Sequence, residues 1–138
     1  MVAGRQNIVA LLLAHGADPN HIDAEGSSLV TRALLRERPN YGALEALFAS
    51  DTVDLNLVDA RKRTVAHYVA ANGDARGINL LAKYGADLDI RDAVGGRPLH
   101  AAAYADSTAA IDALAAHGAD VNAIDDFRRT PLHWAAQV

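Results

Sequence analysis

The chain has 138 residues, about the length of one domain, and 51% of them are apolar although only 5% are aromatic. It contains no cysteine, which excludes a disulfide framework, a thiolate metal site and a cysteine nucleophile. Its formal net charge of −4 does not favour nucleic acid as a partner, and its longest apolar run, residues 8–14, is far shorter than the roughly 20 residues that span a bilayer.

Regularly spaced aspartates divide the chain into repeats. Asp59, Asp92 and Asp125 follow one another at intervals of 33 residues, and Asp23 precedes Asp59 by 36. Between one aspartate and the next come a turn, two short apolar segments and a second turn. A fixed period of this length is typical of a solenoid, in which each unit stacks on its neighbours. We therefore expect a single all-α domain over residues 1–138.

Residues 1–22 are expected to be the second half of a repeat. Gly4 precedes an apolar stripe that ends at Gly16, and Gly73 precedes Gly85 by the same 12 residues. Glycine adopts without strain the left-handed conformation that commonly ends a helix. We therefore predict a helix that ends before Gly16, in a repeat that lacks its turn and first helix.

Residues 23–58 form the most divergent repeat. Residues 28–31 (SLVT) stand where the other repeats have a tetrapeptide ending in histidine, and three extra residues have to be placed. We place two of them near Pro39, which cannot continue a helix, and one at residues 51–52. Insertions in solenoids map to loops, often on a binding face, although drift in a spacer loop is the simpler explanation.

Residues 59–91 and 92–124 are the two regular repeats. The second of them has Gly95 in its turn, but the first has Lys62 in the same slot. Because that slot favours a positive backbone dihedral, Lys62 either carries modest strain or opens the turn. Residues 125–138 form a final half repeat, which stops where its first helix is expected to end.

The two ends of the chain are therefore complementary. The chain starts at the second helix of one repeat and stops after the first helix of another, and neither end resembles a polar cap. Two explanations stay open. The chain is a piece of a longer array, or half-repeats of different copies complete one another in a ring or a filament.

The repeat resembles the ankyrin repeat. The resemblance rests on TPLHxAA at residues 130–136, RPLHAAA at 97–103, and GADxN at 16–20 and 118–122, and it covers nearly the whole chain. It implies stacked helix-turn-helix units joined by β-hairpin-like loops. It also implies that His67, His100 and His133 hydrogen-bond to the turn backbone of their own or the next repeat and do not bind a metal.

Several residue types suit local structure better than catalysis. Thr64 and Thr130 are expected to be helix N-caps, and the aspartate that starts each repeat should accept hydrogen bonds from the backbone two residues on. Since these aspartates recur in every repeat, they indicate turns and not an active site. The sequence has no Ser/His/Asp order, no HExxH motif and no phosphate-binding glycine loop. We therefore expect no enzymatic activity, no cofactor and no metal.

The hairpin tips carry the residues that the repeat does not explain. In the family that the chain resembles, the tips and the first helices line the concave face. We predict a partner-binding edge of basic and aromatic residues, consisting of Arg61, Lys62, Arg63, Arg91, Arg97, Tyr104, Phe127, Arg128 and Arg129. Arginine and aromatic side chains are common anchors of interfaces. Solvated tips, partly neutralised by the neighbouring aspartates, explain the same residues without a partner.

We therefore expect a non-catalytic module that binds another protein, with an acidic segment of the partner on the basic edge, and that binds neither nucleic acid nor membrane. Self-association through the half-repeats, and a role as the targeting arm of a larger enzyme or effector, stay open. The expected location is cytoplasmic, with nuclear or host-cell delivery left open. Asn122 also matches a pattern similar to substrates of an asparaginyl hydroxylase of ankyrin repeats, although a hairpin-stabilising role is the simpler explanation.

Overall fold

A computed structural model describes the backbone of residues 2–137 and the side chains of residues 8–137. Met1 and Val138, the outermost residues of the two predicted half repeats, lie outside the described residues. The chain divides into two compact units, an N-terminal unit of Met1–Asp54 and a C-terminal unit of Leu55–Val138. Whether both behave as one domain stays a prediction. None of the described helices is both long and apolar enough to cross a membrane.

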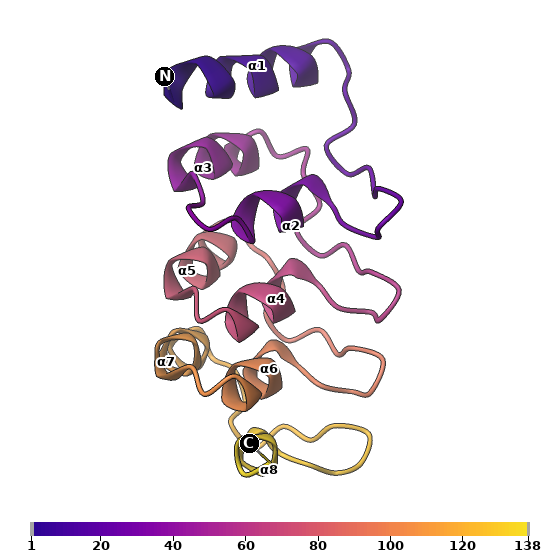
Figure 1. Ribbon diagram of the computed structural model, residues 1–138, viewed down its shortest axis with the longest axis vertical. Helices are drawn as coiled ribbons and strands as arrows, with labels where there is room; N and C mark the ends of the chain where they lie inside the picture. Colours follow the sequence, from indigo (N-terminus) through magenta and orange to yellow (C-terminus); the bar gives the residue numbers. More distant parts are fainter. Residues whose placement is uncertain (1, 138) are drawn as a thin grey trace. The chain divides into compact units, whose positions relative to one another are not determined.

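The N-terminal unit contains helices α1 (Val2–Ala14), α2 (Leu29–Leu34) and α3 (Tyr41–Ala49), and α3 packs against both α1 and α2 (Figure 1). Gly16 follows α1 with φ at +88°, as predicted. Helix α2 ends well before Pro39, and Asn40 caps α3 by accepting the N–H of Ala43 at 3.0 Å. At the second expected insertion, Asp51 adopts φ of +60° and makes the turn that glycine makes in other repeats.

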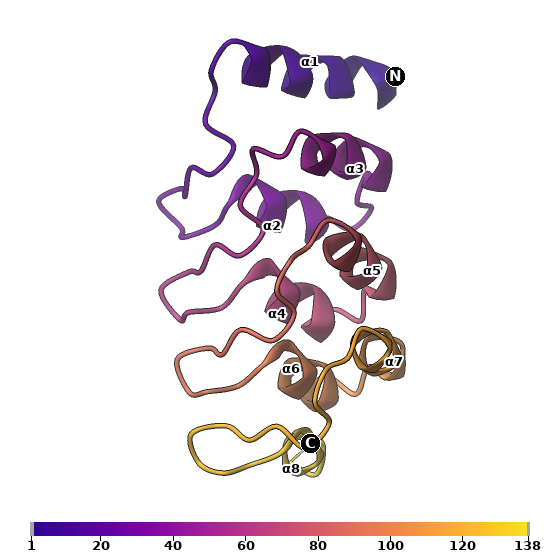
Figure 2. The same ribbon diagram turned by 180° about the vertical axis from the view of Figure 1, so that it is seen from behind.

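The C-terminal unit contains α4 (Val65–Ala71), α5 (Ala75–Lys83), α6 (Pro98–Tyr104), α7 (Thr108–Ala116) and α8 (Pro131–Ala135). Within this unit α4, α6 and α8 stack in one row, and α5 and α7 stack in a second row (Figures 1 and 2). The hairpin loops project beyond the first row, on the side away from the second row. This arrangement confirms the all-α repeat fold.

Small and branched side chains build the core of the C-terminal unit. Ala70, Ala102 and Ala110 are completely buried, which allows neighbouring helices to approach closely. The larger side chains that fill the space between them each contribute roughly 1.5–3 kcal/mol by leaving water. Those with no exposed surface are Val69, Ile78, Leu81 and Leu114. The low aromatic content of the sequence follows from this tight stacking.

Two buried histidines connect successive repeats. The Nδ1 atom of His67 accepts the N–H of Thr64 at 3.1 Å, and its Nε2 atom lies 3.0 Å from the carbonyl oxygen of Gly96 in the next repeat. His100 makes the same pair of contacts with the N–H of Arg97 and the carbonyl of Arg129, both at 3.1 Å. Because Nδ1 accepts a hydrogen bond, Nε2 carries the hydrogen and each ring is neutral. These bonds confirm what the resemblance implied.

His133 makes only the local half of this pattern. Its Nδ1 atom accepts the N–H of Thr130 at 3.1 Å, but its ring is exposed, and Nε2 has no carbonyl partner among the described residues. Thr64 and Thr130 both lie at N-cap positions, as predicted. The hydroxyl of Thr130 accepts the N–H of His133 at 3.4 Å, whereas the hydroxyl of Thr64 lies 3.1 Å from Nδ1 of His67.

Because these two histidines are buried, we expect the fold to lose stability in mild acid. Burial is the main cause that lowers the pKa of His67 and of His100 below 6.5, and the bonds to the next repeat only partly oppose it. The unfolded chain therefore takes up protons at a higher pH than the native chain. The free energy of unfolding is therefore highest above about pH 6.5 and decreases as the pH falls below that value. Each histidine contributes a decrease of at most about 1.4 kcal/mol per pH unit.

Urea unfolding between about pH 7.5 and 5.5 measures this loss. The variant His67→Asn keeps an acceptor near the N–H of Thr64 but does not titrate, so its free energy of unfolding should depend less steeply on pH. Equal pH dependence in the variant and the parent chain would show that His67 does not cause the loss.

Candidate protein-binding surface

One aspartate organises each hairpin tip. We define the first to fourth tips as residues 23–27, 59–63, 92–96 and 125–129. In the second tip, Oδ1 of Asp59 accepts the N–H groups of Arg61 at 2.8 Å and Arg63 at 3.0 Å. Asp23, Asp92 and Asp125 accept the equivalent pairs of N–H groups. The expected role of these aspartates in turns is therefore confirmed.

Lys62 and Arg128 carry strained backbone in two of the tips. Their φ angles are +57° and +60°, whereas glycine occupies the same slot in the first and third tips, at Gly26 and Gly95. The turn stays closed, because the N–H of Lys62 donates to the carbonyl of Asp59 at 2.9 Å. Of the two alternatives left open by the sequence, the structure shows the strained one.

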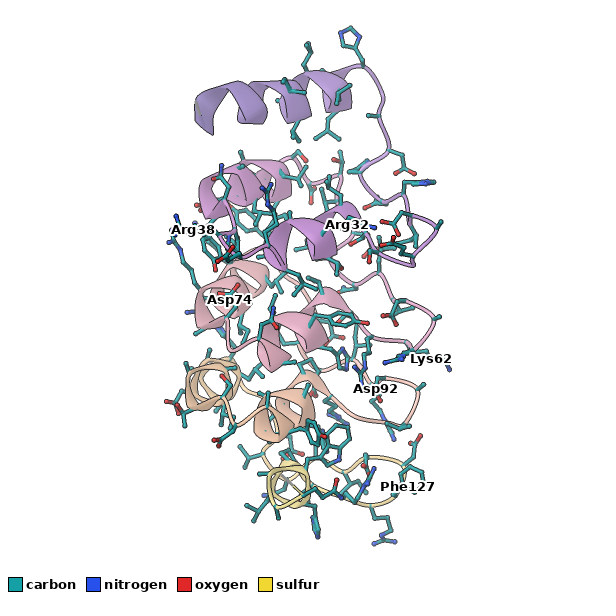
Figure 3. The ribbon with its side chains drawn as sticks, in the orientation of Figure 1. Arg32, Arg38, Lys62, Asp74, Asp92 and Phe127 are labelled. Carbon is teal, nitrogen blue, oxygen red and sulfur yellow. The ribbon has the colours of Figure 1, made fainter. Side chains whose placement is uncertain are left out.

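Backbone hydrogen bonds hold the last three tips side by side. The N–H of Ala93 donates to the carbonyl of Arg61, and the N–H of Asp126 donates to the carbonyl of Val94, both at 2.9 Å. Lys62 and Phe127 lie at the outer ends of their hairpins, and Asp92 lies nearer the helices (Figure 3). The second, third and fourth tips therefore form one continuous edge of the C-terminal unit.

Four of the seven predicted basic residues pair with carboxylates of the chain itself. The ion pairs are Arg63–Asp92 (3.5 Å), Arg91–Asp126 (2.6 Å), Arg97–Asp89 (2.5 Å) and Arg129–Asp125 (2.8 Å). The other three residues, Arg61, Lys62 and Arg128, are exposed and have no carboxylate partner in the part of the chain that the structure describes. Among the seven predicted basic residues, those whose charge is open to a partner thus lie in the second and fourth tips.

Three aromatic side chains gather beside the fourth tip. Tyr104 and Trp134 meet edge to face with ring centroids 6.3 Å apart. The guanidinium of Arg129 lies 4.9 Å from the ring centroid of Phe127 and 5.6 Å from that of Trp134, a cation–π geometry. Phe127 is 67% exposed and Tyr104 is 56% exposed. Tyr104, Phe127 and Trp134 are called the aromatic cluster below.

Trp134 was not among the residues predicted from the sequence. Its indole N–H donates to Oδ2 of Asp125 at 2.9 Å. In two other repeats the residue nine positions after the aspartate, Arg32 or Tyr68, donates to the same carboxylate oxygen. In the repeat that starts at Asp92 this position is an alanine, and Arg63 of the preceding tip pairs with the aspartate. The spacing of nine residues after the aspartate is the signal in the sequence that could have identified these donors.

Asp125 is charged although it is buried. Burial disfavours its charged form, but hydrogen bonds from the backbone N–H of Arg129, the indole of Trp134 and the guanidinium of Arg129 outweigh burial and lower its pKa from 3.8 to about 2. The carboxylate thus remains ionised at neutral pH, where it orients Trp134 and Arg129. The aromatic cluster and the fourth tip share this anchor.

A family model for ankyrin repeats in three copies matches residues 1–92 and again residues 66–138, and the two matches together span the chain. The chain belongs to the ankyrin-repeat family. No curated protein matches it at a significant level. Ankyrin repeats generally act as protein–protein interaction modules, and ankyrin-repeat domains are typically non-catalytic. Stacked repeats of this kind present extended surfaces to their partners.

Outside the tips and the aromatic cluster, the described residues of this ankyrin-repeat chain form an apolar cavity and no candidate metal site. The described residues include no group of three or more histidine, cysteine or acidic side chains placed to hold a metal ion. An apolar cavity of about 490 Å³ lies between α1 and α3, with Leu13, Ala43 and Leu47 in its wall. None of its lining residues titrates. The tips and the aromatic cluster are therefore the candidate functional surface.

Proposed function

We propose that this ankyrin-repeat chain binds another protein through the last three tips and the aromatic cluster, with an acidic segment of the partner on the basic edge. The observation that carries this proposal is that Arg61, Lys62 and Arg128 are exposed beside exposed Phe127 and have no carboxylate partner among the described residues. Opposite charges steer an acidic partner to this edge, and an exposed aromatic side chain provides an apolar anchor.

The rigidity of the surface favours binding. The tips are held by the backbone bonds between Arg61 and Ala93 and between Val94 and Asp126. Arg129 is fixed by Asp125 on one side and by the ring of Phe127 on the other. A surface that is already ordered loses less conformational entropy when it binds, which leaves more of the contact energy as affinity. A cytoplasmic location stays a prediction.

Reversing two unpaired charges tests the proposal. We expect the double variant Arg61→Glu/Arg128→Glu to bind glutamate-rich peptides about tenfold or more weakly than the parent chain, because two attractions become repulsions. Fluorescence anisotropy with labelled peptides at low and moderate salt measures the change. The double variant Arg36→Glu/Arg38→Glu makes the same charge change in the exposed loop between α2 and α3, outside the tip sequences, and should leave affinity unaltered. Equal weakening by both variants would point to a non-specific effect of net charge.

Self-association is a second candidate function. Ile8, Leu11 and Leu12 of α1 and Leu132 of α8 expose 55–78% of their surface, and among the described residues Nε2 of His133 has no carbonyl like those that its counterparts bind. A second copy stacked end to end would cover these groups. Light scattering on the samples used for peptide binding separates the two functions, since only self-association makes the mass rise with concentration. The targeting-arm hypothesis stays a prediction.

A further inference from the structure

Two of the three unpaired basic residues of the predicted edge occupy positions where glycine would be less strained. Lys62 and Arg128 adopt φ angles of +57° and +60° in a slot that Gly26 and Gly95 fill in the other tips. Both side chains are exposed, and within the described residues neither has a carboxylate that would compensate for the strain. Strained backbone of this kind concentrates at sites that bind ligands. Asp51 and Asp106 also have positive φ, but aspartate tolerates this conformation better than lysine or arginine, so the strain at Lys62 and Arg128 points to a role outside the fold.

The hydrogen bonds between neighbouring tips hold these two residues at a fixed distance from each other. Lys62 and Arg128 occupy the same slot two repeats apart, and Val94, which is 39% exposed, lies on the tip between them. Phe127 precedes Arg128 and is also exposed. Along the edge, a basic tip is thus followed by an apolar tip and then by a tip that is both aromatic and basic.

The spacing of the tips sets the spacing expected in a partner. Packed helices of neighbouring repeats lie about 10 Å apart, so residues in equivalent slots two repeats apart are about 20 Å apart. An extended chain advances about 3.3 Å per residue and covers that distance in about six residues. An extended segment laid across the tips would therefore place acidic groups about six residues apart against Lys62 and Arg128.

We infer that the last three tips bind an extended acidic protein segment, which carries two acidic groups about six residues apart and an apolar side chain between them. Lys62, assisted by Arg61, and Arg128 are the specificity-determining residues, and Val94 contacts the central apolar side chain. This inference rests on the proposed function and adds to it the form of the segment and its spacing. It also explains why basic residues occupy this slot in two tips, although glycine makes the same turn in the others.

The glycine variants give this inference a distinctive signature. Lys62→Gly and Arg128→Gly relieve backbone strain, so each should raise the urea midpoint of unfolding, yet the pair together should weaken binding. A purely structural role predicts that stability and binding fall together. Asp106 has φ of +58° in a turn outside the tips, so Asp106→Gly is the matched control. It should raise the midpoint and leave binding unaltered.

The binding probe is a set of fluorescein-labelled peptides, each with two Glu-Glu pairs whose inner glutamates lie four, six, eight or ten positions apart, joined by a serine and glycine spacer with a leucine at its centre. We expect the tightest binding at a spacing of about six, and we expect the double glycine variant to weaken that peptide about tenfold and to lose the preference for spacing. Equal affinity for all spacings, with Arg61→Glu/Arg128→Glu still abolishing binding, would overturn this inference but leave the proposed function intact.

Three other outcomes would overturn more than the predicted spacing. If no acidic peptide binds the parent chain, the proposed function fails together with this inference. If a single-stranded oligonucleotide of similar charge binds as tightly as the best peptide, the edge is a general polyanion site, and the inference of a protein segment is overturned. A lowered urea midpoint in both glycine variants would show that Lys62 and Arg128 serve the turn itself.

Discussion

Replacing His100 by alanine is expected to lower the free energy of unfolding by about 3–5 kcal/mol. The imidazole is completely buried and bonds both the N–H of Arg97 and the carbonyl of Arg129. Its loss leaves two partly buried polar groups without their imidazole partner, each at a cost of up to about 1–3 kcal/mol, and it also opens a cavity. The ring further loses an edge contact with Trp134, whose centroid lies 5.2 Å away. Urea unfolding of both chains measures the difference.

His133 supplies a matched control for this substitution. It occupies the same slot and makes the same local bond to the N–H of Thr130, but its ring is exposed and makes no bond to a following repeat among the described residues. Water can replace the local bond, so His133→Ala should cost about 1 kcal/mol or less. Similar losses in the two variants would mean that the bond to the next repeat contributes little, and that the histidines stabilise only their own helix caps.

The contrast between these histidines shows which parts of the fold were accessible to sequence reasoning. The cap bond joins residues three apart, and the bond to the next repeat follows from the repeat period, so the family resemblance implied both. Lys62 was harder to assign, because a lysine in a glycine slot is compatible with either a strained turn or an open one. The choice depends on whether the bond from Lys62 to Asp59 and the contact with the next tip outweigh the strain, and sequence alone does not reveal that balance.

The sequence predicted which basic residues form the candidate surface, but it did not predict their ion pairs. The sequence identified every basic residue of the tips, but pairs such as Arg91–Asp126 join residues 35 apart and depend on how successive tips are stacked. Only the structure shows that, within the predicted edge, the basic residues without a carboxylate partner among the described residues are Arg61, Lys62 and Arg128. Trp134 was missed because an aromatic residue in a short apolar helix suggests packing, whereas its indole also anchors on a buried carboxylate.

Replacing Gly95 by alanine is expected to lower the free energy of unfolding by about 2–4 kcal/mol. Gly95 has φ of +79°, which costs a residue with a side chain roughly 1–2 kcal/mol. A Cβ atom there would lie 2.5 Å from Oδ1 of Asp126, 2.6 Å from Nη2 of Arg91 and 2.7 Å from the backbone nitrogen of Asp126. That nitrogen is held by its bond to the carbonyl of Val94, so the clash adds about 1–3 kcal/mol.

Two substitutions separate the backbone strain from the clash. Gly85 has φ of +81° but open space around the position of a Cβ atom, so Gly85→Ala should show only the cost of strain. Lys62 occupies the Gly95 slot with a side chain already present, so Lys62→Ala should change stability least. If Gly95→Ala proved no more costly than Gly85→Ala, the third and fourth tips would not be held in close contact. The fixed distance from Lys62 to Arg128 would then lose its basis, because that distance requires tips that do not move apart.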